Sequence, residues 1–131
     1  SDADAGALAV VTTINCDVGE SWESYRGGEQ AELLALCELA NVCCGAHAGD
    51  AELTRRTMAM VAASGVRAGA HPGYPDREHF GRRPRFRQAY GAGAVREMVA
   101  EQVSLAAAAA REAGLALHHV KPHGALYNTA V

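Results

Sequence analysis

The chain has 131 residues, which is enough for one domain with a hydrophobic core. Hydrophobic residues make up 49% of it and charged residues 21%, and the formal net charge is −3. A weakly acidic chain is not typical of proteins that bind nucleic acid or anionic membranes, and no apolar run reaches the length that spans a bilayer. We therefore expect one domain over residues 1–131, with neither nucleic acid nor a membrane as partner.

The cysteine pattern and the first residues indicate a cytoplasmic protein. The four cysteines show no C-x-x-C pairing, which favours free thiols in a reducing compartment; they are Cys16, Cys37, Cys43 and Cys44. Residues 1–9 are small and acidic, without the basic and apolar regions of a secretory signal.

The first half of the chain alternates predicted strands and helices. Residues 8–14 are apolar and rich in β-branched side chains, which predicts a strand buried on both faces. Apolar residues recur at helical spacing over 29–38. Residues 39–44 form a short apolar run that predicts the second strand, with a helix as the alternative at that length. Asp50 is a suitable N-cap for the next helix, and Gly65 is a suitable terminator.

The second half continues the alternation, with one long interruption. Residues 66–70 are the third predicted strand, and 72–93 form a loop with three prolines. A connection of that length inside a compact domain is typical of a lid or a binding loop. Residues 94–113 are the longest predicted helix, 115–120 the fourth strand, and 124–127 the beginning of another helix.

Strands that alternate with helices predict an α/β fold with a parallel sheet and right-handed crossovers. Four such units, ending in a short fourth helix, predict about half of a (β/α) barrel that closes with eight. An open four-stranded sheet is the alternative, although it would leave long unpaired edges.

Polar and ionisable residues follow each predicted strand, in clusters over 15–20, 44–50, 69–76 and 120–124. Because the carboxyl ends of parallel strands lie on one face, these clusters should converge in space. The sequence therefore predicts an enzyme site, or part of one, on that face.

The first cluster contains the carboxylates Asp17 and Glu20, and Asn15 should point to the same side as Asp17. Asp17 could ligate a metal, act as a general base or cap a turn. The second carboxylate, Glu20, favours a functional role for the two residues over a turn-capping role for Asp17.

A histidine alone at a strand end is more often structural than a ligand. Together with Asp17, however, His47 and His71 make an Asp/His/His set that suits a divalent metal, zinc being the commonest. Lys121 could pair with a substrate carboxylate, polarise a carbonyl or, if burial shifts its pKa, act as a base, and His123 suits acid–base chemistry near neutral pH. We interpret His118 and His119 as structural.

Five arginines fall within eleven residues of the long loop, a run that is as consistent with a solvated loop as with anion contacts. They are Arg77, Arg82, Arg83, Arg85 and Arg87.

Five blocks of this sequence, in the same order, resemble the LamB/YcsF family. They are Asn15-Cys16-Asp17-Val18-Gly19-Glu20-Ser21, the stretch 40–50, Gly69-Ala70-His71-Pro72-Gly73-Tyr74-Pro75-Asp76, Phe80-Gly81-Arg82-Arg83 and the stretch 120–128. The resemblance runs from about residue 14 to residue 128.

The resemblance implies an incomplete TIM-like (β/α) barrel related to metal-dependent polysaccharide deacetylases. It implies ATP-dependent opening of the 5-oxoproline lactam to glutamate, with two further subunits that handle ATP and activate the lactam carbonyl. The chain contains no G-x-x-x-x-G-K-[ST] loop, which agrees with ATP binding elsewhere. Family members are about twice as long, so we expect a chain truncated at its C-terminus.

For this reaction we expect Asp17, with His47 and His71, to position the attacking water directly or through a metal. Lys121 would hold the oxyanion or the substrate carboxylate, and His123 would protonate the leaving nitrogen. The expected substrate contacts are Asn15, Tyr74, Arg82 and Arg83.

Two other functions stay open. One is a metal-dependent N-deacetylase of carbohydrates, which would need a bound metal and no ATP. The other is a non-catalytic half-barrel, whose apolar face would lead it to self-associate or to recruit a missing half.

Overall fold

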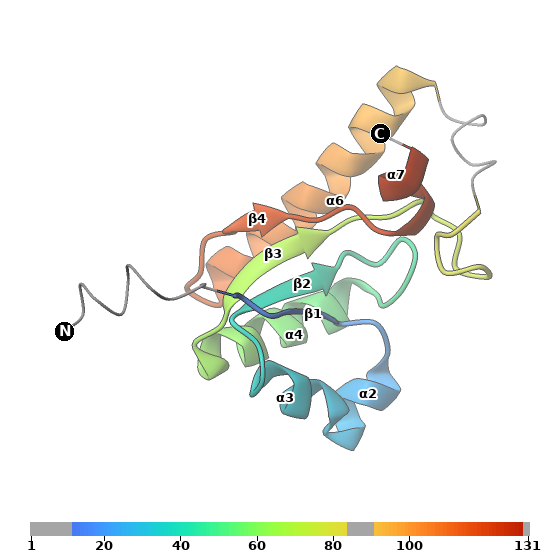
Figure 1. Ribbon diagram of the computed structural model, residues 1–131. Helices are drawn as coiled ribbons and strands as arrows, with labels where there is room; N and C mark the ends of the chain where they lie inside the picture. Colours follow the sequence, from blue (N-terminus) through green and yellow to red (C-terminus); the bar gives the residue numbers. More distant parts are fainter. Residues whose placement is uncertain (1–11, 84–90, 130–131) are drawn as a thin grey trace.

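A four-stranded parallel sheet organises the chain, whose computed structural model describes residues 12–83 and 91–129 (Figure 1). The strands lie side by side in chain order and pair in parallel throughout. They are β1 (Asn15–Val18), β2 (Leu39–Cys43), β3 (Arg67–His71) and β4 (His119–Val120). The predicted α/β class with a parallel sheet is confirmed.

The described helices are α2 (Trp22–Gly27), α3 (Glu29–Leu34), α4 (Ala51–Ser64), α6 (Ala92–Glu112) and α7 (Gly124–Thr129). The first four lie between strands along the chain, and α7 follows β4. Helix α4 packs on β2 and β3 and lies between α3 and α6, so these three form one layer (Figure 1). Within 12–83 and 91–129, no helix is both long enough and apolar enough to cross a membrane.

Alternation along the strands separates the hydrophobic core from a polar face. Val18, Val42 and Ala70 are buried in the main core cluster, together with Met58 of α4 and Ala106 of α6. Residues one position away along the same strands form the opposite face, which the three helices leave uncovered. That face carries the polar side chains of β1, β2 and β4.

The N-terminal strand was predicted in the wrong place. Residues 12–14 lie outside any strand, β1 spans Asn15–Val18, and residues 8–11 fall outside the described part of the chain. The strand forms where the backbone pairs with Leu39–Val42, although only its last residue, Val18, is buried. Backbone pairing to a neighbour has here prevailed over β-propensity.

Other boundaries are close to the prediction. Asp50 caps α4 by accepting a hydrogen bond from the Leu53 amide, and Gly65 ends this helix with a left-handed backbone, φ 71°. Helix α3 ends at Leu34, four residues before the predicted boundary, and α6 begins at residue 92 instead of 94. Strand β4 is two residues long instead of six.

Candidate active site

One register row crosses the whole sheet on its uncovered face. Asp17 of β1 pairs with Asn41 of β2, Asn41 with Gly69 of β3, and Gly69 with His119 of β4. A Cβ atom at Gly69 would lie 2.2 Å from the imidazole of His119. Glycine at this position therefore makes room for His119 to reach over β3 to Asn41.

Asn41 is the centre of this row and is 1% exposed. Its amide nitrogen donates hydrogen bonds to Asn15 Oδ1 at 2.9 Å and to Asp17 Oδ1 at 3.0 Å. Its Oδ1 accepts a hydrogen bond from His119 Nε2 at 2.7 Å. Asn15 and Asp17 therefore do point to the same side, as predicted, and His119 fixes the orientation of the amide that holds them.

Asp17 is the point at which the row meets the residues after β3 and β4. Lys121 Nζ lies 3.3 Å from Asp17 Oδ1, and His71 Nε2 lies 3.5 Å from Asp17 Oδ2. Burial raises the pKa of Asp17, but the Asn41 hydrogen bond and the charges of His71 and Lys121 outweigh that effect and lower it. Asp17 is therefore ionised at neutral pH.

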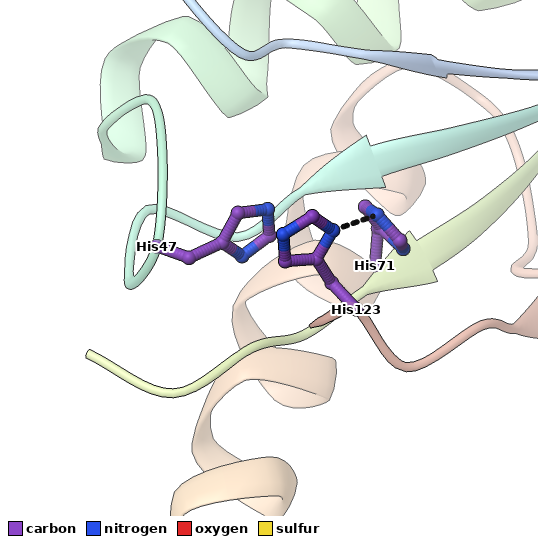
Figure 2. A group of neighbouring side chains, drawn as sticks. All are labelled: His47, His71 and His123. Atoms are coloured by element: carbon purple, nitrogen blue, oxygen red, sulfur yellow. Dashed lines mark hydrogen bonds between the residues drawn. The ribbon is translucent and has the colours of Figure 1, made fainter. Parts of the chain in front are cut away.

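Three buried histidines lie next to one another (Figure 2). His47 comes from the loop after β2, His71 from the end of β3, and His123 from the segment after β4. One nitrogen of each ring lies within 4.8 Å of the others, which is close enough for a shared metal ion. The donors are imidazole nitrogens with a carboxylate nearby, a set that divalent transition metals accept.

The rings of His71 and His123 are held by hydrogen bonds. His71 Nδ1 donates to the Lys121 carbonyl oxygen at 2.5 Å, and His123 Nε2 donates to the Phe80 carbonyl oxygen at 2.7 Å. His71 Nε2 and His123 Nδ1 face each other at 3.0 Å (Figure 2). Burial lowers the pKa of both histidines, although the two carbonyl contacts act in the opposite direction.

His47 is held by packing. Its ring stacks on His123 with centroids 3.9 Å apart and planes 7° from parallel. A Cβ atom at Gly73 would lie 2.5 Å from His47 Nδ1, so only glycine allows this approach. This Nδ1 is buried without a hydrogen-bond partner among the described residues. Burial and the charges of the other two histidines lower the pKa of His47 to about 3.

A cavity of about 280 Å³ opens beside the cluster. Arg82 lines it and lies 5.0 Å from the ring of Phe80. Glu20, half-buried near Asp17 and Arg82, has a raised pKa because of burial and the charge of Asp17. The cavity is lined by Asp17, His71, Arg82, Lys121, Pro122, His123, Gly124 and Tyr127.

Two predicted substrate contacts are engaged elsewhere. Arg83 forms a two-point ion pair with Asp76, whose side chain is fully buried, at 2.5 and 2.8 Å. Tyr74 is 2% exposed and packs in a second hydrophobic cluster with Ala125 and Leu126, so it belongs to the core. Neither side chain is among the residues that line the cavity of about 280 Å³.

The arginine run divides by role. Arg77 donates hydrogen bonds to the carbonyl oxygens of Gly45 and Gly49, which ties the long loop to the loop that carries His47. Arg82 alone among the described arginines of the run lines the cavity. Arg85 and Arg87 lie outside the described residues.

Sequence reasoning missed two residues of the network. Asn41 received no role, although an amide inside the apolar run 39–44 was a detectable signal. His119 was interpreted as structural, whereas it orients Asn41 across the sheet. No local pattern connects two residues that are 78 positions apart, so only the fold reveals their contact.

These features define a parallel α/β protein with an ionisable site at the carboxyl ends of its strands, suited to hydrolytic chemistry. The LamB/YcsF family model matches residues 12–131, and the chain belongs to this family.

Named relatives agree with this assignment. The chain is 47% identical over 117 residues to the 5-oxoprolinase A subunit of Tolumonas auensis, covering 89% of this chain and 45% of that protein. It is 49% identical over 119 residues to the protein of the same name from Syntrophobacter fumaroxidans, covering 91% and 46%. The chain thus spans about half the length of the curated relatives that it matches.

A solved structure supports the fold. The crystal structure of a lactam utilization protein from Thermus thermophilus superposes with a TM-score of 0.78 at 38% identity. The match covers 91% of this chain and 47% of that one.

Proposed function

We propose that this chain contributes the strand-end site of a hydrolase that opens the lactam of 5-oxoproline to give glutamate. The observation that carries the proposal is the position of Asp17, held by Asn41 and in contact with both His71 and Lys121. The names of the relatives, the 5-oxoprolinase A subunit and the lactam utilization protein, supply the substrate class.

Opening an amide requires a deprotonated water and a stabilised oxyanion. Asp17, ionised at neutral pH, would orient the water and accept its proton. Lys121 would hold the oxyanion or the substrate carboxylate from its position 3.3 Å from Asp17. Arg82, on the wall of the cavity, is the better candidate of the two predicted arginines for a second anion contact.

The leaving nitrogen must also gain a proton. His123 was expected to supply it, but both of its ring nitrogens are engaged and it is 7% exposed. Glu20 is the other candidate for this role, because it is half-buried near Asp17 and burial raises the pKa of its carboxyl group.

The remaining parts of the reaction would come from other chains and from a cofactor. ATP would bind on two partner subunits that activate the lactam carbonyl. A divalent metal such as zinc, expected on Asp17, His47 and His71, would lower the pKa of the attacking water. The sheet itself would belong to an incomplete TIM-like barrel related to polysaccharide deacetylases.

The test is glutamate release from 5-oxoproline and ATP. It compares this chain alone, the two partner subunits alone, and the mixture of all three. We expect glutamate only from the mixture. Asp17→Asn should lower its rate at least about 100-fold, because a general base contributes about that much or more. Glu52→Gln, which neutralises an exposed carboxylate of α4, is the matched control and should retain activity.

A further mixture distinguishes a failed proposal from an inactive assay. It replaces this chain with the full-length relative from Tolumonas auensis. Glutamate from that mixture and none from the mixture with this chain would contradict the proposal. Full turnover by Asp17→Asn would contradict the role of Asp17.

The histidine cluster favours one second candidate, a metal-dependent N-deacetylase of carbohydrates. Both reactions hydrolyse an amide, so the same carboxylate and oxyanion contacts would serve. Release of acetate from an N-acetyl sugar without ATP, abolished by chelation, would support this candidate over lactam opening.

A further inference from the structure

The hydrogen bonds of His71 and His123 leave two lone pairs facing each other. A carbonyl oxygen only accepts, so His71 Nδ1 and His123 Nε2 must each carry a hydrogen to reach Lys121 and Phe80. A neutral imidazole has one N–H. His71 Nε2 and His123 Nδ1, 3.0 Å apart, are then both unprotonated. Two facing lone pairs repel unless a positive species lies between them.

A proton is a poor occupant of this position. It would create an imidazolium where His71 is 1% exposed and His123 is 7% exposed. Burial disfavours that charge, as do the nearby cations Lys121 and Arg82, whereas the Asp17 carboxylate and the two carbonyl hydrogen bonds favour it.

A metal ion next to both nitrogens fits their separation. Tetrahedral zinc with Zn–N bonds of about 2.05 Å places two ligand nitrogens about 3.3 Å apart. The observed nitrogens are 3.0 Å apart, and Asp17 Oδ2 lies 3.5 Å from His71 Nε2. In addition, a histidine that binds a metal commonly donates its other N–H to a backbone carbonyl, as both of these rings do.

We propose that His71 Nε2, His123 Nδ1 and the Asp17 carboxylate bind a divalent transition metal ion such as Zn²⁺. His47 is then a packing residue that holds the ring of His123. This set replaces the expected ligand His47 with His123.

The orientation of His47 is the reason for excluding it. Ligand lone pairs lie in the ring plane, and stacked rings 7° from parallel direct them alongside each other instead of toward one ion. Gly73 packs against His47 Nδ1, and His47 Nε2 faces the Cys43 sulfur at 3.5 Å. Closeness of the three rings is therefore not sufficient for a three-histidine site.

Metal binding by variants of the untagged chain tests the proposal. The chain is stripped with a chelator, dialysed against Zn²⁺, and assayed for bound metal by elemental analysis. We expect one equivalent in the unmodified chain. His71→Gln and His123→Gln should each weaken binding at least about 100-fold, because each removes a ligand. His47→Gln, the same change at a ring of the same cluster, should stay within about fivefold.

A second measurement needs no variant and so does not depend on how the variants fold. The ring nitrogen NMR shifts of His71 Nε2 and His123 Nδ1 should move on adding Zn²⁺, and those of His47 should not. Absence of stoichiometric binding at micromolar Zn²⁺ would overturn the proposal. So would loss of binding in His47→Gln with retention in His123→Gln.

This inference concerns the site and not the substrate. Metal binding is measured without 5-oxoproline, ATP or partner subunits, so its outcome is independent of the glutamate assay. Stoichiometric metal without glutamate release would contradict the proposed reaction and leave the metal site standing.

Discussion

The two ends of the sheet differ in what they contain. A cavity of about 750 Å³ lies at the amino ends of the strands, where Leu39 and Arg67 begin β2 and β3. The cavity at the carboxyl ends is about 280 Å³. Yet the buried histidines and the Asp17–Lys121 pair all lie at the carboxyl ends.

This difference separates cavity volume from the candidate site. The amino-end cavity is lined mainly by apolar side chains of α3 and the strand beginnings, with Glu38 and Arg67 as its only charged members among the described residues. The carboxyl-end cavity brings acidic, basic and imidazole groups within hydrogen-bonding range. Convergent polar groups with shifted pKa values mark a functional site better than size does.

The largest expected effect comes from replacing one cationic side chain at each end of the sheet. Lys121→Met at the carboxyl end should lower the kcat/KM of glutamate release by about 100-fold to 1,000-fold, the usual loss for a group that stabilises an oxyanion. Arg67→Met at the amino end is the matched control and should change it less than about threefold. Steady-state kinetics with the partner subunits measures both.

Equal losses from the two substitutions would remove the functional distinction between the ends. An unchanged rate in Lys121→Met would exclude Lys121 as the oxyanion contact. Folding should not confuse this test, because the Lys121–Asp17 pair is 45% and 33% exposed, and such pairs contribute about 0–1 kcal/mol.

The amino end should matter for stability instead. Leu34 of α3 is 2% exposed and belongs to the main core cluster, so Leu34→Ala should lower the free energy of unfolding by about 2–5 kcal/mol. Leu36→Ala, two residues on and 73% exposed, should change it by less than about 0.5 kcal/mol. Urea denaturation of both variants measures the difference, and similar midpoints would contradict the core position of Leu34.

The sequence predicted those parts of the fold whose signals are local. Asp50 and Gly65 delimit α4 through cap chemistry that any chain of this local sequence would form. The first strand was predicted too early in the chain because residues 10–14 are β-branched. The strand forms instead at Asn15–Val18, where the backbone pairs with β2. Short elements such as α2 have too few residues to show a period.

The site was predictable as a set of residue types and not as a set of contacts. Parallel topology alone brings Asp17, His71 and Lys121 to one face, and this was anticipated. It does not indicate that Asn41 holds Asp17, nor that Arg83 pairs with Asp76. Those pairings depend on side-chain direction and loop path, which the three-dimensional structure determines.

The smallest expected effect tests how the carboxyl-end cluster affects stability. The pKa of His47 is lowered from 6.5 to about 3, so below pH 6.5 the unfolded chain gains a proton that the folded chain does not. The free energy of unfolding should therefore fall as the pH drops from 6.5 toward 3. At pH 5 the loss is about 2 kcal/mol from this residue, at about 1.36 kcal/mol per pH unit, and the lowered pKa values of His71 and His123 add to it.

Urea denaturation between about pH 7.5 and 5, with chelator present to keep metal from the cluster, measures this slope. His47→Gln should reduce it, because glutamine does not titrate and only the contributions of His71 and His123 remain. His118→Gln, at an exposed position before β4, provides the matched control and should retain the full slope. A flat profile in the unmodified chain would mean that protonated His47 is accommodated in the folded state. The rings of His47 and His123 would then separate easily in the folded state, and the side chains at the carboxyl end would not be rigidly packed.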